Sequence, residues 1–293
     1  MQTFLVHASR YYRRSAVNKA QPTRSHLQTR HPARRKRRMP ADHEAQTATP
    51  DFVEALARGL RVLRCFGPDT RTLGNLELAQ LTGLPKSTVS RIVYTLTSLG
   101  YLRYHPETGQ YSPDVGVLAL GYGLLASLEV RQVARPFMEE LAQATGAAVA
   151  LGRFDGESMI YVEAIHGSSA LYLRLPVGYR LGMDSAMGRA YLARLDEPAR
   201  ERLLAQLKGS VPSPEQIADA LQDTEQTGCC FGIGDWQQGI NAIAIAFESH
   251  TDEGVFVISC GGPSSLLPEA SLRTDIAERL RGITQRLAPG IVL

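Results

Sequence analysis

The sequence predicts an α+β protein: an N-terminal winged helix-turn-helix, then a C-terminal domain whose helices cover an antiparallel sheet. Three observations predict this fold. Residues 76–99 have the pattern of a short helix, a tight turn and a second helix, and an aromatic-rich hairpin pattern follows directly. From residue 130 onward, paired strands alternate with helices. The 293 residues leave room for about two domains, each with its own core.

Charge divides the chain into three unlike parts. Residues 1–41 carry eleven Lys or Arg and no acid, and residues 42–112 carry seven charges of each sign. Residues 113–293 carry fourteen basic and twenty-two acidic residues. This distribution predicts that a nucleic acid contacts the N-terminal half. No apolar run approaches the ~20 residues of a membrane span, so we expect a soluble protein without a membrane partner.

Residues 1–50 have the composition of a disordered arm. The run from Arg34 to Arg38 is a block of like charge, and the segment has too few apolar residues for a core. It lacks the apolar stretch of a secretory signal, although an Arg-rich, acid-free segment is also typical of an organellar transit peptide. Three interpretations remain open: an arm that contacts phosphates, a tail without a role, or untranslated sequence with Met39 as the true start.

The winged helix is expected over residues 51–113. An amphipathic helix over residues 51–66 is stopped by Gly67-Pro68, and a second helix over 76–81 is ended by Gly83. Pro85 lies in the first turn of a third helix, which ends before Gly100. The apolar stripe of the first helix consists of Val53, Leu56, Leu60, Leu63 and Phe66.

The third helix has an apolar face and a polar face that carries no acid. Val89, Ile92, Val93 and Leu96 cluster on one side, and hydroxyls, basic groups and one Tyr lie opposite or at the edges. Hydroxyls suit phosphate oxygens, and Arg can pair with both acceptors of a guanine edge. This layout predicts a recognition helix in the major groove of double-stranded DNA. The predicted contacts are Lys86, Ser87, Thr88, Ser90, Arg91 and Tyr94.

A hairpin directly after this helix predicts the wing. Strands over residues 101–105 and 110–112 flank a turn with Pro106 and Gly109. The wing would follow the phosphate backbone or reach the minor groove, with Arg103, His105 and Gln110 as its polar candidates. A linker helix is expected over residues 114–128, with Leu118, Leu125 and Leu128 among its apolar positions.

The C-terminal part, residues 129–293, has the pattern of an antiparallel sheet with covering helices. Its first helix contains Val133, Phe137, Leu141 and Ala142 and ends at Gly146, and Asp155-Gly156 predicts a tight hairpin turn. Strands are predicted over residues 147–154, 159–165, 170–175, 240–248 and 255–260, and further helices over 187–195, 198–207, 214–226 and 272–287.

Residues 178–190 are predicted to form a binding loop. Three glycines let the backbone approach a ligand, and the free N–H groups of the following helix favour a carboxylate. Two arginines offer charge nearby. The alternative is that the glycines serve turns and the arginines are solvated. The glycines are Gly178, Gly182 and Gly188, the helix cap is Asp184 or Ser185, and the arginines are Arg180 and Arg189.

Cysteine spacing and motifs argue against metal binding and catalysis. Cys65, Cys229, Cys230 and Cys260 form no Cys-x-x-Cys pair, which predicts free thiols in a reducing cytoplasm rather than disulfides or a zinc site. No Gly-x-Ser-x-Gly, phosphate-loop or His-Glu-x-x-His motif is present. At the level of the sequence, no motif makes His166, expected at a loop tip, or His250 a catalytic base. We therefore expect no catalytic residue, cofactor or metal.

From about Val53 onward the chain resembles the IclR family of bacterial transcription regulators. Leu84-Pro85-Lys86-Ser87-Thr88-Val89-Ser90-Arg91 is similar to the family's recognition helix, and Leu99-Gly100-Tyr101-Leu102 to its first wing strand. Met183-Asp184-Ser185-Ala186-Met187-Gly188-Arg189-Ala190 resembles its effector-pocket motif. The opening helix at 55–63, the return strand at 109–111, the start of the effector domain at 135–146 and the late strands at 239–244 and 259–263 match in the same order.

The resemblance implies a winged helix joined by a linker helix to a GAF-like effector-binding and oligomerisation domain. It implies a homodimer or a dimer of dimers on a palindromic operator, a small and usually anionic effector, and a bacterial cytoplasm. Repressors are frequent in the family, and activators occur. The effector-binding residues that it implies are Met183, Asp184, Ser185, Ala186, Met187, Gly188, Asp235, Trp236, Ala242, Ser259 and Gly261.

The chain departs from the family's pattern at the predicted pocket. Gly232 stands at the place of the pocket acid, Ala242 at the place of a frequent Cys, and Gly261 within an altered Ser-x-Ser-Gly-Pro segment. Smaller side chains enlarge a pocket, and Phe231 and Trp236 add apolar surface. We therefore expect a larger or more aromatic acid as the effector.

Two other functions need tests. A DNA-binding protein that responds to no metabolite would show a mobility shift that no metabolite alters, and its domain over residues 128–293 would bind no ligand. An enzyme that uses the C-terminal domain is the remaining alternative, and the missing motifs argue against it.

Overall fold

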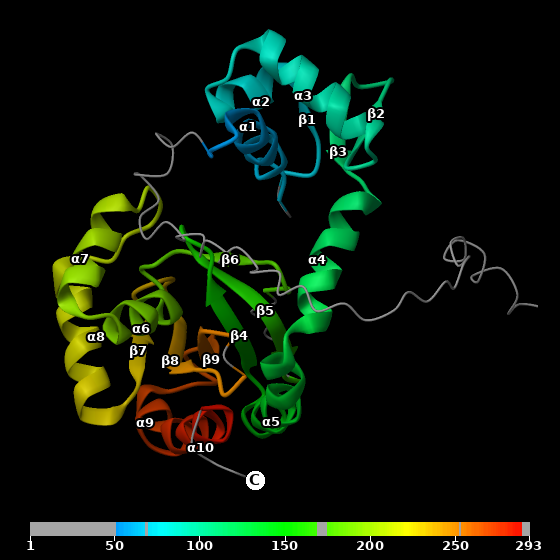
Figure 1. The fold of residues 1–293 in the computed structure, drawn as a ribbon. Coiled ribbons are helices and arrows are strands. Elements are labelled where there is room, and N and C mark those ends of the chain that lie inside the picture. Colours follow the sequence, from blue (N-terminus) through cyan, green and yellow to red (C-terminus); the bar gives the residue numbers. More distant parts are fainter. Residues whose placement is uncertain (1–50, 68–69, 169–174, 252, 289–293) are drawn as a thin grey trace, which may run out of the picture. The chain divides into compact units, whose positions relative to one another are not determined.

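The computed structural model describes residues 51–67, 70–168, 175–251 and 253–288. The basic arm, the Met39 start and all but the last residue of the strand predicted over 170–175 lie outside the described residues. The first elements in chain order are α1 (Glu54–Leu63), β1 (Leu73–Gly74), α2 (Asn75–Thr82), α3 (Lys86–Ser98), β2 (Leu102–His105), β3 (Gln110–Pro113) and α4 (Val115–Ser127) (Figure 1).

The first three helices and a small antiparallel sheet form a winged helix. Gly83 has φ 68°, a left-handed conformation that glycine adopts without strain, and it makes the tight turn between α2 and α3. The sheet has the order β1-β3-β2. The strand β1 was not predicted, because two residues are too few to show the alternation of polar and apolar side chains that indicates a strand. The buried core consists of Val62, Leu73, Leu78, Val89, Val93 and Leu102.

The apolar face predicted for α3 is confirmed, and the one predicted for the first helix is confirmed only at its C-terminal end, where Leu63 and Phe66 pack against the core. Val89 and Val93 are buried, and Ile92 and Leu96 pack against the same core. On α1, by contrast, Leu56 and Leu60 are exposed, and Val62 supplies the buried contact. Helix α1 therefore turns most of its apolar stripe away from the core of its own chain.

The C-terminal elements surround one six-stranded antiparallel sheet of order β6-β5-β4-β9-β8-β7. The bounds are α5 (Glu129–Thr145), β4 (Ala148–Phe154), β5 (Met159–His166), β6 (Arg180–Leu181), α6 (Ala186–Arg194), α7 (Glu197–Gln206), α8 (Pro214–Thr227), β7 (Cys230–Ile233), β8 (Ile240–Glu248), β9 (Val255–Pro263), α9 (Glu269–Ser271), the π-turn η1 (Leu272–Ile276) and α10 (Ala277–Leu287).

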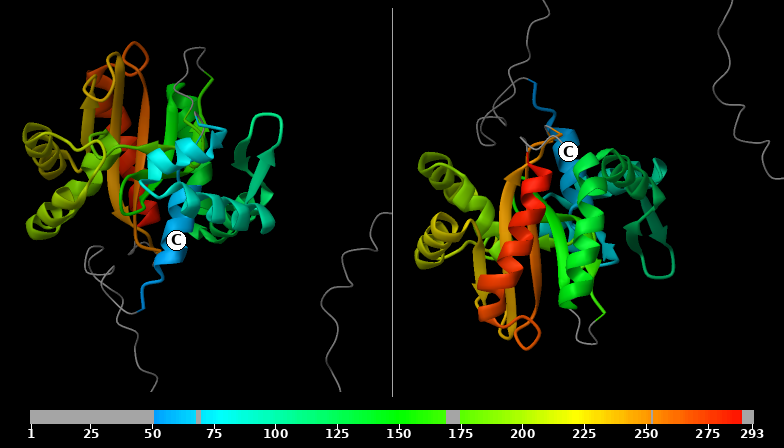
Figure 2. Two further views of the ribbon diagram at one scale, coloured as in Figure 1. Left: turned by 90° about the horizontal axis from the view of Figure 1, so that it is seen from above. Right: turned by 90° about the horizontal axis from the view of Figure 1, so that it is seen from below.

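Helices cover the two faces of the sheet differently. Helices α5 and α10 contact each other and one face, and α6 contacts β7, β8 and β9 on the other face with α8 beside it (Figures 1 and 2). The face under α5 and α10 carries large side chains such as Ile243, Ile245 and Phe256. The face under α6 carries smaller ones, such as Ala150 and Ala244. The small side chains of the sheet thus lie on the face under α6.

Three elements differ from the sequence-based prediction. Strands β6 and β7 were not predicted, because each is short and lies inside a segment interpreted as a loop. The last helix begins at Glu269 and passes through the π-turn η1, whereas a regular helix from Leu272 was expected. In the described part of the chain no single helix is long and apolar enough to span a membrane. Helices α4 and α5 satisfy that test only as a pair, bent by 77°.

Candidate functional site

Helix α3 presents a polar face to the outside. Its second helical turn buries Val89 at 0% exposure, whereas Ser87, Ser90, Arg91 and Tyr94 around it are exposed. Their exposure follows from the 3.6-residue period, because these positions lie opposite the core-facing valines. Lys86 is also exposed, and Thr88 is half-buried. The helix therefore places two hydroxyls, two cations and one aromatic ring on a surface without any carboxylate.

The wing places its polar side chains in contacts that the sequence did not indicate. Arg103 is exposed, but its Nη2 donates to Asp114 Oδ1 at 3.0 Å. Asp114 also caps α4 by accepting from the Val115 amide, and together these contacts lower the pKa of Asp114. His105 Nε2 and Ser112 Oγ lie 2.9 Å apart across the hairpin, and Gln110 is half-buried. Arg103 thus connects the wing to the linker helix.

A cavity lies on the face of the sheet that carries small side chains. The lining residues come from all six strands of the sheet, the start of α6 and the loops beside them. They are Ala148, Val149, Ala150, Tyr161, Ala164, His166, Leu175, Leu181, Ser185, Ala186, Met187, Gly232, Asp235, Trp236, Ile240, Ala242, Ser259 and Gly261.

The floor of the cavity is one row of small residues that crosses the sheet. Strand pairing sets Ala148 opposite Gly261, Gly261 opposite Ala242, and Ala242 opposite Gly232. His166 ends the row beside Ala148. Because cross-strand partners point to the same face of a sheet, the four small side chains leave space above them. The cavity is therefore a consequence of strand register.

Helix α6 begins at the wall of this cavity. Ser185 caps the helix by accepting from the Gly188 amide at 3.2 Å, and it donates to the Gly182 carbonyl. The amides of Ala186 and Met187 are in the first turn, where helix geometry offers them no partner inside the helix. Both residues line the cavity. A helix start of this kind attracts anions through free N–H groups and the helix dipole.

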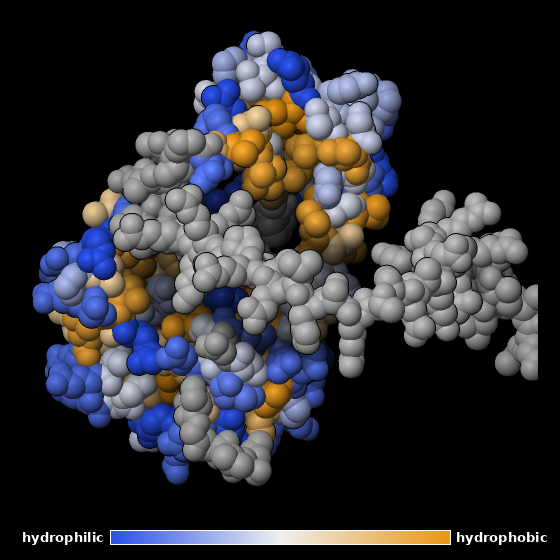
Figure 3. Space-filling view, in the orientation of Figure 1, coloured by the Kyte–Doolittle hydropathy of each residue, from blue (hydrophilic) through white to orange (hydrophobic). Residues whose placement is uncertain are grey.

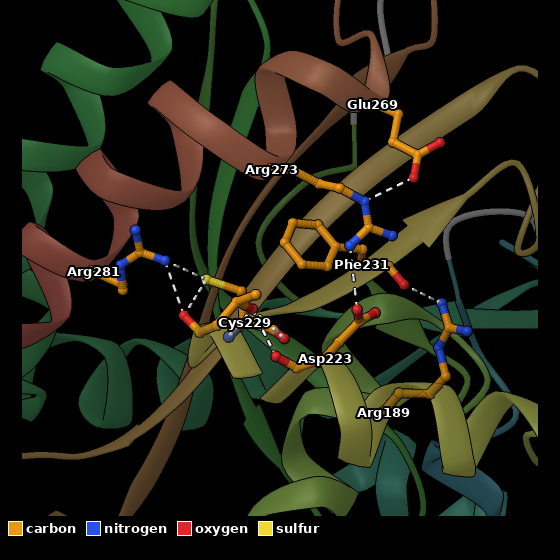
Figure 4. Close-up of polar contacts among 8 residues, drawn as sticks. Arg189, Asp223, Cys229, Phe231, Glu269, Arg273 and Arg281 are labelled. Carbon is orange, nitrogen blue, oxygen red and sulfur yellow. Dashed lines mark hydrogen bonds and ion pairs between the residues drawn. The ribbon is translucent and has the colours of Figure 1, made fainter. Parts of the chain in front are cut away.

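A buried ion pair lies behind the cavity wall. Arg189 of α6 is 3% exposed, and its Nη1 contacts Asp235 Oδ2 at 2.5 Å. Its Nη2 donates to the Phe231 carbonyl at 3.0 Å, as Figure 4 shows, and among the residues that the structure describes its Nε has no hydrogen-bond partner. Asp235 itself lines the cavity. Arg189 therefore compensates and holds a carboxylate that faces the ligand space.

Tyr161 and Ser259 supply hydroxyls on the sheet side. Their side chains share a hydrogen bond, but burial dominates and raises the pKa of the Tyr161 phenol, which stays neutral. Cys230 is also buried on the α6 side of the sheet, and burial raises the pKa of its thiol to about 12. Apart from Asp235 and His166, the described cavity lining consists of apolar side chains, glycines and the hydroxyl-bearing residues Tyr161, Ser185 and Ser259.

Eight of the eleven effector-site residues expected from the sequence line the cavity: Ser185, Ala186, Met187, Asp235, Trp236, Ala242, Ser259 and Gly261. The other three do not. Met183 is fully buried in the core, Asp184 is not part of the lining, and Gly188 lies where a Cβ would be only 2.4 Å from the Met183 Cα. Gly188 therefore allows α6 to approach the loop, and it does not contact the ligand space.

Other expectations for this region also need correction. Arg180 pairs with Asp155 and donates to Ser158, away from the cavity lining. The ring of Phe231 lies 4.4 Å from the guanidinium carbon of Arg273, which also pairs with Asp223 and Glu269 (Figure 4). Phe231 therefore adds no apolar surface to the pocket. His166 ends β5 and lines the cavity, whereas a loop tip was expected.

Sequence reasoning identified Ala242 and Gly261 of the floor but missed Ala148 and the row that joins them. Strand β8 contains Ala242, Ala244 and Ala246 alternating with Ile243, Ile245 and Phe247. This alternation of small and large residues was the available signal, because it places all the small side chains on one face. The lining residues missed were Ala148, Val149, Ala150, Tyr161, Ala164, Leu175, Leu181 and Ile240, and Gly232 was seen only as a lost acid.

Two family descriptions match the chain. "IclR helix-turn-helix domain" matches residues 55–106, and "Bacterial transcriptional regulator IclR C-terminal" matches residues 122–288, more than half of the chain. The chain belongs to the IclR family. The matched relatives are transcriptional regulators rather than enzymes, as the missing catalytic motifs predict.

Relatives of known role match the IclR-family chain along most of their length. HTH-type transcriptional regulator TsaQ1/TsaQ2 of Comamonas testosteroni is 30% identical, covering 83% of this chain and 90% of its own. Transcriptional repressor IclR of Escherichia coli is 27% identical, covering 74% and 82%. A crystal structure of an IclR-family regulator from Brucella abortus is 42% identical with a TM-score of 0.73, covering 80% and 91%. Both the fold and the presence of a DNA-binding domain follow from this membership.

Proposed function

We propose that this IclR-family protein is a sequence-specific repressor whose binding to a palindromic operator is controlled by a small carboxylic acid. The observation that carries this proposal is the cavity at the start of α6. It combines free first-turn amides with a floor of small residues and an apolar wall that includes Trp236, Leu175 and Leu181. DNA binding alone does not require a cavity of this kind. Because a repressor binds DNA, we expect the protein in the bacterial cytoplasm.

The exposed face of α3 supports the DNA-binding half of the proposal. Lys86 and the hydroxyls of Ser87 and Ser90 suit phosphate oxygens, and Arg91 has the geometry for a guanine edge. Thr88, Tyr94 and Gln110 complete the contact set. We assign Arg103 a different first role, because its pairing with Asp114 fixes the wing to α4. A phosphate contact by Arg103 would compete with that ion pair.

The cavity supports an anionic effector with an apolar body. Its carboxylate would bind the amides of Ala186 and Met187, and Trp236 would cover the apolar part. The charges of Arg189 and Asp235 cancel, so they do not repel an anion. The small floor leaves space for a body larger than that of a two- or three-carbon acid.

Exposed apolar side chains support a homodimer. Helix α4 has no buried residue, and Leu118, Leu120, Tyr122 and Leu124 are 55–70% exposed. Figure 3 shows apolar side chains on the surface of the winged helix and at the start of α4. An apolar helix of this kind is stable in water when a partner covers it. A second copy of the chain fits, because a palindromic operator needs two recognition helices.

The proposal is tested with the full chain and a library of fragments of the surrounding genome. Mobility shift identifies the bound operator, and a panel of carboxylic acids that includes acetate, benzoate and phenylacetate is then added. We expect a larger acid to stabilise the protein in a thermal shift and to release the operator. If only two- or three-carbon acids stabilised the protein, the predicted size of the effector would be wrong. If no acid changed the operator complex, the proposed regulation by a carboxylic acid would be wrong.

The dimer has its own test. Leu118→Glu and Leu124→Glu place charges on the apolar face of α4, and we expect sedimentation to show a loss of dimer with the winged helix still folded. Glu201→Gln on exposed α7 is the matched surface control. A dimer that survives both leucine substitutions would place the interface elsewhere.

A further inference from the structure

The joint between the linker helix α4 and helix α5 is a single residue. Leu128 is the C-cap of α4 and the N-cap of α5. Helix ends leave backbone carbonyls and amides without partners inside the helix, and here side chains bind several of them. Ser127 Oγ donates to the Leu124 carbonyl, Arg131 Nη1 to the Leu125 carbonyl and Gln132 Nε2 to the Ala126 carbonyl, and Glu253 accepts from the amides of Glu129 and Val130. The direction of α4 at this joint therefore depends on side-chain contacts.

Arg131 connects the joint to the sheet. Its Nε lies 2.9 Å from Glu163 Oε2 of strand β5, and its Nη1 donates to the Leu125 carbonyl at 3.4 Å. The Glu163 side chain is only 4% exposed, and Arg135 Nη1 lies 3.3 Å from the same carboxylate oxygen. A buried carboxylate is costly unless it is paired, so Glu163 holds its two arginines in place. A shift of β5 at Glu163 would thus reach the end of α4 through one guanidinium.

Strand β5 carries cavity-lining residues close to Glu163. Tyr161 and Ala164 both line the cavity. The register between β4 and β5 shifts at this point, so Val162 is an extra residue in a β-bulge, and Glu163 lies on the α5 side of the strand. Its Oε1 accepts from the amide of Ala164 at 3.1 Å. The position of the carboxylate therefore follows the backbone of a residue in the cavity wall.

The other end of α4 is tied to the winged helix by backbone contacts. The Gly116 amide donates to the Gly100 carbonyl at 3.1 Å, and the Asp114 amide donates to the Tyr101 carbonyl at 2.9 Å. A Cβ at Gly116 would lie 2.6 Å from the Gly100 carbonyl oxygen, so only glycine allows this approach. Because Gly100 directly follows the end of α3, a change in the direction of α4 would move the recognition helix with it.

We propose that the ion pair between Glu163 and Arg131 couples the cavity to the joint, so that an acid in the cavity shifts β5, moves Arg131 and redirects α4. This inference rests on the proposed control of operator binding by an acid, and it names the residues that transmit the signal. Both are positioning residues that touch neither the acid nor DNA. A ligand shifts an equilibrium only as far as its affinities for the two states differ. The acid therefore binds more tightly when the joint is in the arrangement that releases the operator.

Two substitutions in the full chain break this link from either side. Glu163→Gln removes the charge and keeps the shape, and the arginines that it releases are 26% and 51% exposed, so they can reach water. Arg131→Gln removes the other partner, while Arg135 and the Ala164 amide still bind Glu163. Glu139→Gln is the matched control, because it removes an exposed acid that pairs with Arg135 on the same helix.

The measured quantity is the ratio of operator dissociation constants with and without saturating phenylacetate or benzoate, obtained by mobility shift. We expect the acid to weaken operator binding by about 5- to 150-fold in the parent and in Glu139→Gln, the usual range for two coupled sites. In Glu163→Gln and Arg131→Gln the ratio should fall close to one, and calorimetry should show that both still bind the acid. The double variant should show no further change, because the two residues act as one unit.

Thermal melts confirm that each variant is folded, and the ratio itself separates coupling from a structural role. A variant that was only less stable would keep the ratio of the parent. That result in both folded single variants would overturn the inference and leave the acid-controlled repressor standing. Loss of acid binding in folded Glu163→Gln would mean that Glu163 shapes the cavity itself, which would also overturn the inference. An operator complex of the parent that neither acid alters would overturn both the inference and the proposed regulation.

Discussion

Helix α3 and the cavity of the six-stranded sheet encode function in different ways. The polar face of α3 comes from consecutive residues of one helix, so its period of 3.6 residues places Ser87, Ser90 and Arg91 outside. The floor of the cavity comes from four strands, and it exists only because their register sets small residues side by side. A local pattern therefore reveals the first surface, whereas the second depends on pairing between distant segments.

The largest expected effect is a difference in stability between substitutions on the two faces of strand β8. Ile243 is fully buried in the core under α5 and α10, so Ile243→Ala should lower the free energy of unfolding by about 2–5 kcal/mol. The adjacent Ala242→Leu points into the open cavity and should change that free energy much less. It should abolish binding of an acid such as phenylacetate.

Urea denaturation and calorimetry on both variants check this contrast. Because the two positions are neighbours on one strand, each variant is the control for the other. A loss of stability in Ala242→Leu as large as that in Ile243→Ala would mean that the α6 side is as tightly packed as the other side. The cavity would then not be open.

The winged helix could be predicted well from the sequence, and the reasons are local. The apolar face of α3 and the turn at Gly83 follow from period and glycine chemistry, and both are present. The exposed stripe of α1 was misassigned, because an apolar helix face does not reveal whether its own chain or another covers it. Arg103 was interpreted as free, because its partner Asp114 caps a different element.

The candidate pocket could be predicted only in part. Ser185 and its neighbours were identified because a capping serine before a helix is a local signal. Arg189 was expected to offer charge to a ligand, but its guanidinium is occupied by Asp235 and the Phe231 carbonyl. These partners lie more than forty positions away, so no spacing rule connects them to Arg189.

The second prediction tests the local surface. Arg91→Ala should weaken binding to the cognate operator by about 1–3 kcal/mol if its guanidinium pairs with a base, and the loss on random DNA should be much smaller. Arg202→Ala on α7 is the matched control, because it removes an exposed arginine from another helix. Mobility shift at one fixed salt concentration measures the affinities of the parent and of both variants for each of the two DNA types. An equal loss on both DNA types would make Arg91 a phosphate anchor instead.

The smallest expected effect concerns a contact that again only the fold could reveal. Helix α5 has no capping side chain of its own at Leu128, and Glu253 accepts from the amides of Glu129 and Val130 instead. Burial alone would raise the pKa of Glu253, but the hydrogen bonds from Thr251 and these amides outweigh it and lower the pKa below its ordinary value of 4.5. The ionised carboxylate therefore stabilises the folded chain.

Glu253→Gln should accordingly lower the free energy of unfolding by about 1 kcal/mol at pH 7, the usual value of a lost helix cap. Because the pKa is lowered by folding, this contribution is complete above the unfolded pKa near 4.5 and disappears as the pH falls through the folded value. Denaturation curves at pH 7 and at successively lower pH should therefore show the two proteins converging in acid. Glu201→Gln, at an exposed position of α7, should leave the free energy of unfolding unchanged both at pH 7 and in acid. If the difference in the free energy of unfolding between the Glu253 variant and the parent stayed constant with pH, the carboxylate charge would have no part in capping α5.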